Sequence, residues 1–553
     1  MNVPSRIAAL RKTMVAHNID AIIIPSSDPH QSEYIAEHWQ ERVWISGFTG
    51  SAGLVAVTKD HAGLWTDSRY FLQGEMELKG TGVELHKMLN QFGTPYIDFL
   101  AENLSKGSRV AVNGLMFSKA VVDTMKKSFA ESGIDLVYNL DLISEIWTNR
   151  PPLSDAPIFY HDEKFSGSTI ADKFEQIRTT LKDNRADYHL ITTLDDIAWT
   201  FNIRGNDVMY NPVSVAYAIV GKSDAHIFVN EKKLTDEVKK QFSKNNIKIH
   251  PNGEIIGFLN NMKESESILV DTQLCNQTIY DAINGKIIQV NSIPKFLKAI
   301  KNGTEIGHIR DVMKKDGAAL ANTFYWLEQC LSSGQKINEV DVARKLAEQR
   351  SQQKFYQGES FGAIIGYNEN GAIIHYHPEP ETCKTIKPEG ILLVDSGGQY
   401  SDGTTDITRT FTLSQPTEEQ IKAYTLILKG MIALSMAKFP EGTTGGQLDT
   451  LARQFLWAEG MNYGHGTGHG VGFFLNVHEP PQGFTPLSSE RSRTVQQPGM
   501  LTSNEPGYYK EGGFGMRIEN LIITVKSEKP GFLEFETVTL YPLEHKLIDK
   551  QRL

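Results

Sequence analysis

The stretch ILLVDSGGQYSDGTTDITRTF, residues 391–411, decides how the C-terminal half of the chain is expected to fold. An apolar run ends at Asp395, a glycine-rich turn follows, and strand-like residues resume after Asp406. A hairpin of this kind brings both carboxylates to one pocket, where they repel each other unless a cation or a proton lies between them. By itself, the pattern is equally compatible with a polar turn that carries two solvated aspartates.

A second segment, HGTGHGVG at residues 465–472, carries two histidines four residues apart. The glycines at 466, 468, 470 and 472 argue against a helix. In an extended chain His465, Thr467 and His469 face one way, and the glycines let another backbone or a substrate approach closely. Two histidines on one strand face favour a site, whereas a single buried histidine is more often structural.

Two glutamates follow, in TSNEPGYY (502–509) and in GMRIEN (515–520). Glu505 precedes Pro506, which restricts the backbone and ends the preceding segment. Glu519 shares a predicted strand face with Arg517. That pair is interpreted either as a surface ion pair or as an outer partner that orients a metal ligand.

Together these segments supply four carboxylates and one imidazole: Asp395, Asp406, His469, Glu505 and Glu519. Such an oxygen-rich set suits Mn²⁺, and also Co²⁺, Fe²⁺ or Zn²⁺. Two divalent cations would neutralise the four carboxylates. Two metals about 3.5–4 Å apart can clamp a bridging hydroxide and polarise a carbonyl. The sequence therefore predicts a dinuclear hydrolytic centre.

The composition argues against several other classes of protein. A chain of 553 residues is too long for one core, so we expect two or three domains. The net charge of −10 argues against a nucleic-acid or anionic-membrane partner. We expect no transmembrane helix and no signal peptide, because no apolar run is long enough and the N-terminus lacks a cleavage site. Three scattered cysteines, Cys275, Cys330 and Cys383, indicate neither a disulfide framework nor a zinc knuckle, and favour a reducing cytoplasm.

The distribution of helix-like and strand-like segments predicts three domains. These are an N-terminal α/β domain over 1–150, a second, similar α/β domain over 151–302, and an α+β domain over 303–553 with a largely antiparallel sheet. The proline-rich segment 148–157 forms the first boundary. The similar layout of the first two domains hints at a duplication. In the second domain, Ser166 or Ser168 is expected to cap a helix whose apolar spacing includes Ile170.

The order of the five ligands, with GTGHGVG (466–472) and MRIEN (516–520), resembles the pita-bread metallopeptidases. This family contains methionine aminopeptidase, prolidase and aminopeptidase P, with creatinase as a metal-free relative. Four N-terminal motifs resemble the long, three-domain form of Xaa-Pro aminopeptidase: GFTGSAG (47–53), LWTDSRYFLQ (64–73), LDDIAWTFNIRG (194–205) and YNPV (210–213). The resemblance covers essentially the whole chain. It implies two creatinase-type N-terminal α/β domains followed by a pita-bread catalytic domain with a curved, mainly antiparallel sheet.

The resemblance also implies a role for each metal ligand. Asp395 would bind one metal, His469 and Glu505 would complete the other, and Asp406 and Glu519 would bridge the two. Glu505 would in addition be the general base. The complete ligand set argues against a creatinase-like loss of metal.

Further residues are assigned by the same resemblance. His375 in AIIHYHP and His478 in NVHEPP match histidines near the scissile bond, and His465 matches one along the peptide groove. Arg517 matches the arginine two residues before the last ligand, and Tyr509 is placed more loosely beside it. Glu505 and these five residues are thus candidates for catalysis or substrate binding.

The expected activity is hydrolysis of the N-terminal Xaa-Pro bond of peptides by a metal-bridged hydroxide. The cofactor would be two divalent ions, with Mn²⁺ favoured and Zn²⁺ or Co²⁺ possible, and the resemblance implies a cytoplasmic homodimer. An apolar proline pocket could involve Phe361, Phe473, Phe474 or Tyr509. Arg69 is interpreted as structural, with a partner's site as the alternative.

Two other functions remain open at this point. A prolidase would share the ligands but cleave only Xaa-Pro dipeptides, and prolidases of this family resemble one N-terminal domain plus the catalytic domain. A catalytically inactive binding protein could reuse the fold, although the complete ligand set argues against it. Methionine aminopeptidase would not need the long N-terminal half.

Overall fold

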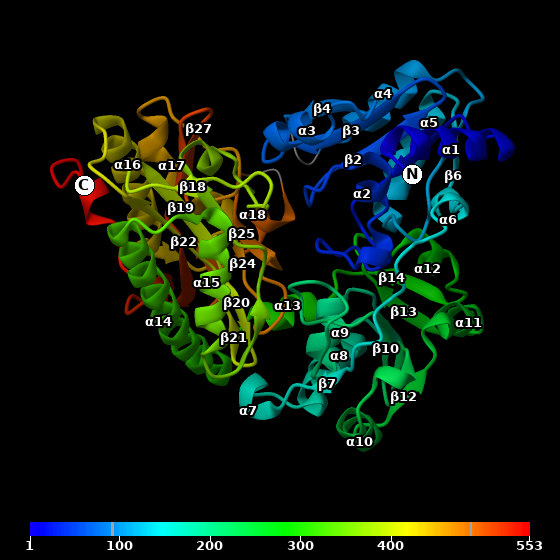
Figure 1. Ribbon diagram of the computed structural model, residues 1–553. Helices are drawn as coiled ribbons and strands as arrows, with labels where there is room; N and C mark the ends of the chain where they lie inside the picture. The colour runs from blue at the N-terminus through cyan, green and yellow to red at the C-terminus, as the bar shows by residue number, and fades with distance from the viewer. Residues whose placement is uncertain (90–92, 487–488) are drawn as a thin grey trace. The chain divides into compact units, whose positions relative to one another are not determined.

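The computed structural model describes residues 1–89, 93–486 and 489–553, and the chain divides into two compact units (Figure 1). Unit 1 contains Met1–Tyr160 and Ser168–Pro294, and unit 2 contains His161–Gly167 and Lys295–Leu553. No helix within the described residues is both long enough and apolar enough to cross a membrane. All three cysteines are free thiols, and Cys275 and Cys330 are buried.

Unit 1 contains two six-stranded mixed sheets with the same strand order and directions. In the first sheet the order is β4 (Glu84–Met88), β3 (Ala62–Asp67), β2 (Leu54–Thr58), β1 (Ala21–Ile24), β5 (Arg109–Ala111) and β6 (Asp135–Val137). In the second it is β12 (Ile247–His250), β11 (Ala225–Val229), β10 (Ala216–Gly221), β8 (Tyr188–Ile191), β13 (Ser267–Val270) and β14 (Lys286–Gln289). In both, the second to fourth strands pair antiparallel and the outer pairings are parallel. The hint of a duplication is therefore supported by topology.

Helices of unit 1 cover these sheets. The main ones are α1 (Val3–Ala16), α2 (Glu41–Ser46), α3 (Phe71–Glu77), α4 (Pro95–Asn103), α5 (Lys119–Glu131), α8 (Ile170–Asp183), α9 (Leu194–Thr200), α10 (Asp236–Lys244), α11 (Ile255–Asn260) and α12 (Gln277–Asp281). The expected cap of α8 at Ser166 or Ser168 is wrong. Thr169 forms the cap, because its hydroxyl accepts from the N–H of Asp172 at 3.1 Å while the Asp172 carboxylate accepts from the N–H of Thr169 at 2.8 Å.

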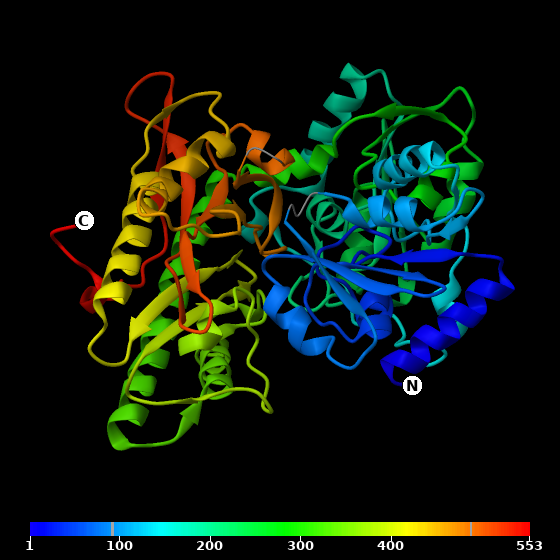
Figure 2. The same ribbon diagram turned by 90° about the horizontal axis from the view of Figure 1, so that it is seen from above.

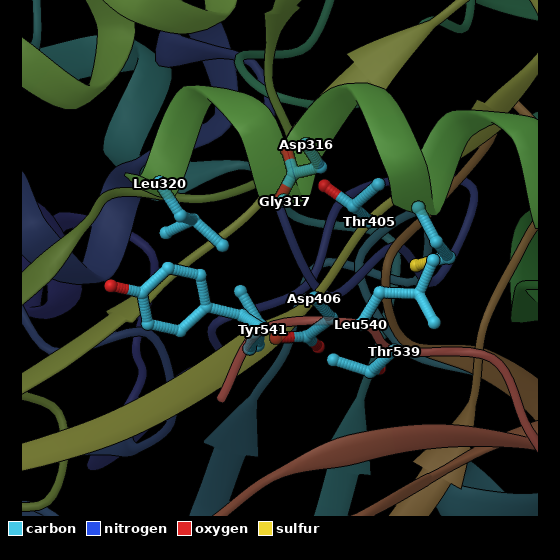
Figure 3. A pocket seen from close by; sticks show the side chains of 10 residues that line it. Asp316, Gly317, Leu320, Thr405, Asp406, Thr539, Leu540 and Tyr541 are labelled. Atoms are coloured by element: carbon cyan, nitrogen blue, oxygen red, sulfur yellow. The ribbon is translucent and has the colours of Figure 1, made fainter. Parts of the chain in front are cut away.

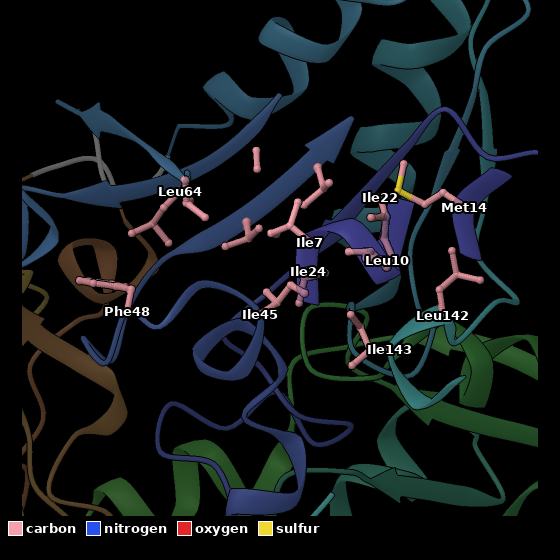
Figure 4. Packing of buried hydrophobic residues seen from close by; sticks show 14 of the residues in the cluster. Ile7, Leu10, Met14, Ile22, Ile24, Ile45, Phe48, Leu64, Leu142 and Ile143 are labelled. Carbon is pink, nitrogen blue, oxygen red and sulfur yellow. The ribbon is translucent and has the colours of Figure 1, made fainter. Parts of the chain in front are cut away.

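The core of the first sheet explains the N-terminal helix. Four apolar residues of α1 have helical spacing, and three of them, Ile7, Leu10 and Met14, are buried on one face, whereas the fourth, Val15, is exposed. Figure 4 shows these side chains beside Ile22 and Ile24 of β1, within one buried cluster. Full burial of each such side chain stabilises the fold by about 1.5–3 kcal/mol. The apolar run of β1 is buried because it has neighbours on both sides, one antiparallel and one parallel.

Arg69 also lies in unit 1, in the turn after β3. Its guanidinium donates to both carboxylate oxygens of Asp67, at 2.8 and 2.7 Å, and lies 5.2 Å from the centre of the Tyr70 ring. A bidentate pair of this kind holds the turn in one conformation. These contacts support the structural interpretation of Arg69.

Unit 2 combines four main helices with antiparallel sheets, and every strand pairing within it is antiparallel among the described residues. The helices are α14 (Gly303–Ser333), α15 (Glu339–Ser351), α16 (Glu418–Ser435) and α17 (Gly445–Trp457). Figures 1 and 2 show α16 lying beside α17. Capping boxes fix the starts of these helices, for example at Asn302 before α14 and Thr417 before α16.

The sheets of unit 2 carry the predicted ligands. One sheet has the order β17 (Ile364–Tyr367), β19 (Ile391–Ser396) and β22 (Ile407–Thr412). A larger one has the order β23 (Phe439–Pro440), β30 (Phe532–Thr537), β29 (Asn520–Lys526), β26 (Leu501–Asn504), β24 (Gly468–Gly470) and β25 (Glu479–Phe484). Two small sheets consist of β16 (Tyr356–Glu359), β20 (Gly398–Tyr400) and β21 (Gly403–Thr404), and of β27 (Gly507–Lys510) and β28 (Phe514–Arg517).

Candidate metal centre

The two aspartates stand on neighbouring antiparallel strands, as the sequence predicts. β19 pairs with β22 so that Asp395 lies opposite Thr408, and Asp406 immediately precedes β22. The chain between them forms β20 and β21 instead of one simple turn. Both aspartates are buried, at 7% and 4% exposure. The alternative of two solvated aspartates in a polar turn is therefore wrong.

His469 lies on β24, between β25 and β26. The glycines on either side are required by close neighbours: a Cβ on Gly468 would lie 1.8 Å from the carbonyl oxygen of Ser503, and one on Gly470 would lie 2.2 Å from that of Glu479. The Nδ1–H of His469 donates to the carbonyl of Gly470 at 2.9 Å. This bond assigns the tautomer and leaves the lone pair on Nε2 directed away from the strand.

Glu505 follows β26 and is held by two hydrogen bonds. Its N–H donates to the carbonyl of Thr467 at 2.8 Å, and its Oε1 accepts from the Ser503 hydroxyl at 2.9 Å. The same hydroxyl accepts from the N–H of His469 at 3.0 Å. Ser503 therefore ties the histidine strand and the glutamate strand together, and it orients two candidate ligands at once.

Glu519 lies between β28 and β29, so Arg517 and Glu519 do not share a strand face as expected. Glu519 Oε2 accepts from the Thr408 hydroxyl at 2.8 Å. Arg517 instead donates through Nη2 to Asp395 Oδ2 at 2.6 Å and through Nε to Thr408 at 3.1 Å. Arg517 is fully buried. Of the two interpretations, the structure favours a partner that orients a ligand, and the ligand is Asp395.

These segments bring the candidate ligands to one place. Nε2 of His469 lies 3.4 Å from Asp406 Oδ2 and 3.3 Å from Glu505 Oε1. Ligand atoms of Asp406, His469 and Glu519 all lie within 4.8 Å of one another. Asp395 Oδ1 and Glu519 Oε1 are buried and have no hydrogen-bond partner in the described part of the chain. Buried carboxylate oxygens without donors need either a proton or a cation.

The electrostatics give the same answer. Burial raises the pKa of Asp406 well above its usual value, and the neighbouring Asp395 raises it further. Burial likewise raises the pKa of Glu519, with Asp406 adding to the effect, and raises the pKa of Glu505 to about 7. Burial lowers the pKa of His469 to about 4, so its imidazole is neutral at neutral pH. A neutral imidazole can bind a divalent cation directly. The carboxylates repel one another when they are ionised, and a divalent cation between them would relieve that repulsion.

A chain of hydrogen bonds connects this centre to His465. Arg517 Nη1 donates to the Tyr509 hydroxyl at 2.6 Å, and that hydroxyl lies 2.8 Å from Nε2 of His465. Nδ1 of His465 lies 2.7 Å from the carbonyl of Gly466, so the Tyr509 hydroxyl donates to Nε2. The chain therefore runs from Asp395 through Arg517 and Tyr509 to His465.

Thr467 does not share a face with the two histidines, which is a correction to the sequence interpretation. Its hydroxyl donates to Asp449 Oδ1 at 2.6 Å and contacts the Tyr463 hydroxyl, and Thr467 is fully buried. Only residues 468–470 form strand β24, and the backbone before them turns. The alternation of side chains that a strand imposes therefore begins at Gly468 and does not extend back to Thr467.

His478 lies beside the centre, because its ring centre is 4.2 Å from that of His469 at an angle of 73°. His375 lies in the segment between β17 and β19, after the short 3₁₀ turn η4 (Asn368–Ala372). That turn packs on β28, where a Cβ on Gly515 would lie 1.7 Å from the carbonyl of Gly371. His375 thus follows a turn fixed against the strand that carries Arg517.

A buried carboxylate anchors the His375 segment. Glu339, at the start of α15, has no solvent exposure. It accepts hydrogen bonds from the Tyr376 hydroxyl at 2.8 Å, from the Asn370 amide at 2.9 Å and from two backbone N–H groups at 2.8 Å. Tyr376 is the neighbour of His375 in the sequence. Glu339 therefore restrains the backbone on both sides of the histidine.

A small pocket lies behind Asp406 (Figure 3). Figure 3 shows Asp316, Gly317 and Leu320 of α14 on one side, and Asp406 and the C-terminal segment 539–541 on the other.

The phenylalanines proposed for the proline pocket are all buried. Phe473 belongs to a buried core cluster, and Phe361 and Phe474 are also buried.

Four further residues at or near this centre carry little signal in the sequence. Thr408 and Ser503 lie two positions from Asp406 and Glu505, and this spacing is their only local signal. His377, two residues after His375, is influenced electrostatically by Asp395. Glu339 carries no local signal, because its partners lie 28–45 positions away.

Known families match the chain in three places. Metallopeptidase family M24 matches residues 307–526, and the creatinase/prolidase N-terminal domain matches residues 6–144 and again residues 149–305. These matches confirm the expected fold class, with two creatinase-type N-terminal domains before a pita-bread domain.

Full-length relatives have similar names. A probable Xaa-Pro aminopeptidase P of Neurospora crassa is 42% identical over 577 residues, which cover 100% of this chain and 84% of that protein. Aminopeptidase P2 of Arabidopsis thaliana is 40% identical and covers 96% of this chain and 80% of that protein. The similarity therefore extends over both units.

Solved structures agree. An X-prolyl aminopeptidase from Caenorhabditis elegans, described as a cytosolic enzyme with a di-nuclear active site, has a TM-score of 0.95 at 34% identity and covers 100% of this chain and 93% of that chain. An Xaa-Pro dipeptidase from Bacillus anthracis has a TM-score of 0.56 at 24% identity over 68% of this chain and 99% of that chain, and it shares the fold alone.

Proposed function

Because this chain belongs to the Xaa-Pro aminopeptidase P branch of metallopeptidase family M24, we propose that it hydrolyses the N-terminal Xaa-Pro bond of peptides. One observation supports the proposal above all others. Three buried carboxylates, Asp395, Asp406 and Glu519, and the partly buried Glu505 gather with Nε2 of His469, and Asp395 Oδ1 and Glu519 Oε1 have no hydrogen-bond partner among the described residues.

We assign two divalent cations to this donor set. Asp395 would hold one, His469 and Glu505 the other, and Asp406 and Glu519 would be shared. Mn²⁺ is the ion that we propose, and Zn²⁺ and Co²⁺ suit the same donors. When bound, such ions would supply the hydrolytic nucleophile by lowering the pKa of a water, and they would polarise the scissile carbonyl.

The protein's own groups perform the proton transfers. Glu505, whose Oε1 lies 3.3 Å from Nε2 of His469, accepts a proton from the attacking water and passes it to the departing proline nitrogen. That nitrogen carries no hydrogen in the peptide, so it must gain one to leave. His478 and His375 stabilise the oxyanion or the leaving nitrogen by hydrogen bonds.

Positioning depends on the hydrogen-bond chain behind the centre. Arg517 holds Asp395 in one orientation through a bond of 2.6 Å, and Tyr509 holds His465 at the other end through a bond of 2.8 Å. We propose that His465 and Tyr509 border the peptide groove. Their mutual bond lets His465 present a defined edge to a substrate without new ordering cost.

The prolidase alternative shares the same ligands. The two creatinase-type domains and the full-length relatives support the aminopeptidase, because the Bacillus anthracis dipeptidase aligns with only 68% of this chain. A comparison of Xaa-Pro dipeptides with Xaa-Pro-Yaa tripeptides tests the choice, with an Xaa-Ala-Yaa tripeptide as the control. We expect faster cleavage of the Xaa-Pro-Yaa tripeptide after Mn²⁺ loading, and strict dipeptide preference would refute the proposal.

An inactive binding protein would give a different result. Such a protein would cleave none of the three peptides even with metal added, and it would bind less than one metal ion per chain at this centre. We also propose a cytoplasmic location and a homodimer. Sedimentation velocity at two protein concentrations tests the second point.

A further inference from the structure

Three metal-binding side chains also lie together in unit 1, in a group that the proposed function does not use. His61 lies in the turn before β3, and Glu84 and His86 stand two positions apart on β4, so they share one face of the strand. Ligand atoms of the three residues all lie within 4.8 Å of one another. Within the described residues, only this group and Asp406, His469 and Glu519 meet that criterion.

The two imidazoles face each other through ring nitrogens. Nε2 of His61 lies 3.0 Å from Nε2 of His86. Two nitrogens that bind one ion at about 2.1 Å lie about 3.4 Å apart in tetrahedral geometry and about 3.0 Å apart at the angle of about 90° of square-planar Cu²⁺ or Ni²⁺. A carboxylate oxygen of Glu84 lies within 4.8 Å of a ring nitrogen of each histidine, and Oε2 lies 3.7 Å from Nδ1 of His61, the nitrogen that does not face His86. The observed spacing therefore fits a shared cation as well as it fits one hydrogen bond.

Packing holds both rings in place. The ring of His86 stacks on Trp65, with centres 4.1 Å apart and planes at 9°, and Phe99 contacts both imidazoles. Gly63 makes room for them, because a Cβ there would lie 2.7 Å from Nε2 of His61 and 2.8 Å from Cδ2 of His86. Rings that are held by packing lose little entropy when they bind an ion.

Charge and access suit a cation. Burial lowers the pKa of both histidines, which favours the neutral rings, and each neutral ring has one nitrogen lone pair that can bind a cation. The Glu84 side chain is 67% exposed, which leaves the third ligand and the remaining coordination positions open to water. One carboxylate charge partly neutralises a divalent ion.

From this geometry we propose that His61, His86 and Glu84 bind one divalent transition-metal ion, separate from the centre in unit 2. Two imidazoles and one carboxylate bind Zn²⁺, Cu²⁺ and Ni²⁺ more tightly than they bind Mn²⁺ or Mg²⁺. The site lies on the edge strand of the first sheet.

The second sheet of unit 1 provides a natural comparison. At the equivalent strands, Nδ1 of His226 on β11 lies 3.0 Å from Nε2 of His250 on β12. There the nearby carboxylate of Asp224 is already paired with Lys248 Nζ at 2.7 Å. A lysine ammonium neutralises that carboxylate and repels a cation, so the second histidine pair is expected to bind no metal.

This comparison supplies matched variants for a test on the full chain. We would equilibrate the wild type and the variants His86→Ala, Glu84→Lys and His250→Ala with Zn²⁺ and measure bound metal per chain by mass spectrometry. His86→Ala and Glu84→Lys are each expected to bind one Zn²⁺ fewer than the wild type. His250→Ala is expected to bind the same number as the wild type.

Two controls make the result decisive. Glu84→Lys introduces a positive charge like that of Lys248 in the second sheet. Because residue 84 is exposed, this substitution tests the site without opening the core. Circular dichroism checks the fold of each variant. Cu²⁺ electron paramagnetic resonance should show a component with hyperfine coupling to two nitrogens, which is lost in His86→Ala and persists in His250→Ala. Equal Zn²⁺ content in all four proteins, or loss in His250→Ala as well, would overturn the proposal. Peptidase activity is expected to stay within twofold, so failure of the proposed function would not alter this outcome.

Discussion

Replacement of Glu505 by Gln in the metal-free protein is expected to stabilise the fold at alkaline pH. Burial raises the pKa of this carboxyl from 4.5 to about 7, and the neighbouring Asp406 carboxylate contributes. A raised pKa means that the folded state binds more protons than the unfolded state, so stability falls as the pH rises from about 4.5 and the full loss is present above about 7. Glutamine has the same shape and carries no charge, so Glu505→Gln avoids this loss.

The magnitude follows from the size of the rise. Each pH unit between the two pKa values corresponds to about 1.4 kcal/mol, so a rise from 4.5 to about 7 corresponds to a loss of about 3 kcal/mol from Glu505 alone. Ser503 still has a carbonyl oxygen to donate to in the glutamine variant, so its hydrogen bond at 2.9 Å is retained. In chelator at pH 8, we therefore expect the variant to be more stable than the wild type by about 3 kcal/mol.

Urea unfolding of both proteins at pH 4.5 and pH 8, with chelator or with Mn²⁺, measures the effect. At pH 4.5 the difference should nearly vanish, because the carboxyl is largely protonated in the folded state. With Mn²⁺ the order should reverse, because the variant has lost a charged ligand. A variant that is less stable than the wild type in chelator at pH 8 would refute the reasoning.

Three further changes test other parts of the centre. Arg517→Lys keeps the positive charge but can form only one of the three hydrogen bonds that Arg517 donates, so activity and Mn²⁺ affinity should each fall about tenfold or more. The control Arg310→Lys, at an exposed ion pair, should leave both quantities within twofold. Glu339→Gln should loosen the His375 segment and so lower kcat/KM about tenfold, while the amount of bound metal stays constant. A simultaneous loss of metal would argue against an effect through the His375 segment. Asp406→Ala should abolish peptide cleavage together with metal binding, whereas His465→Ala should retain part of the activity with full metal content. Complete loss of activity in both variants, with metal retained in both, would contradict this division of roles.

The residue pattern predicted local elements well where one face is buried. The spacing of Ile7, Leu10, Met14 and Val15 predicts a helix, and the first three are buried on one face of α1, whereas Val15 is 79% exposed. These predictions succeed because burial on one side of a helix or strand repeats with the period of that element. The cap of α8 was predicted one to three residues too early, since several hydroxyl side chains compete within that turn.

The candidate ligands were also readable from the chain, because carboxylates and imidazoles beside turns and glycines stand out from a solvated surface. What the sequence left open was which groups face them. Arg517 and Glu519 are two residues apart, yet Arg517 pairs with Asp395, 122 positions away. Local spacing suggested the nearer partner, and strand pairing selected the distant one.

The sequence by itself therefore determined the fold class and the amphipathic elements, and it predicted five candidate ligands of one centre. Only the tertiary structure decided that Thr408 and Ser503 orient two of those ligands, that Glu339 anchors the His375 segment, and that His61 meets His86. The physical reason is that these contacts depend on the register between strands and on the packing of segments far apart in the chain. No local periodicity encodes them.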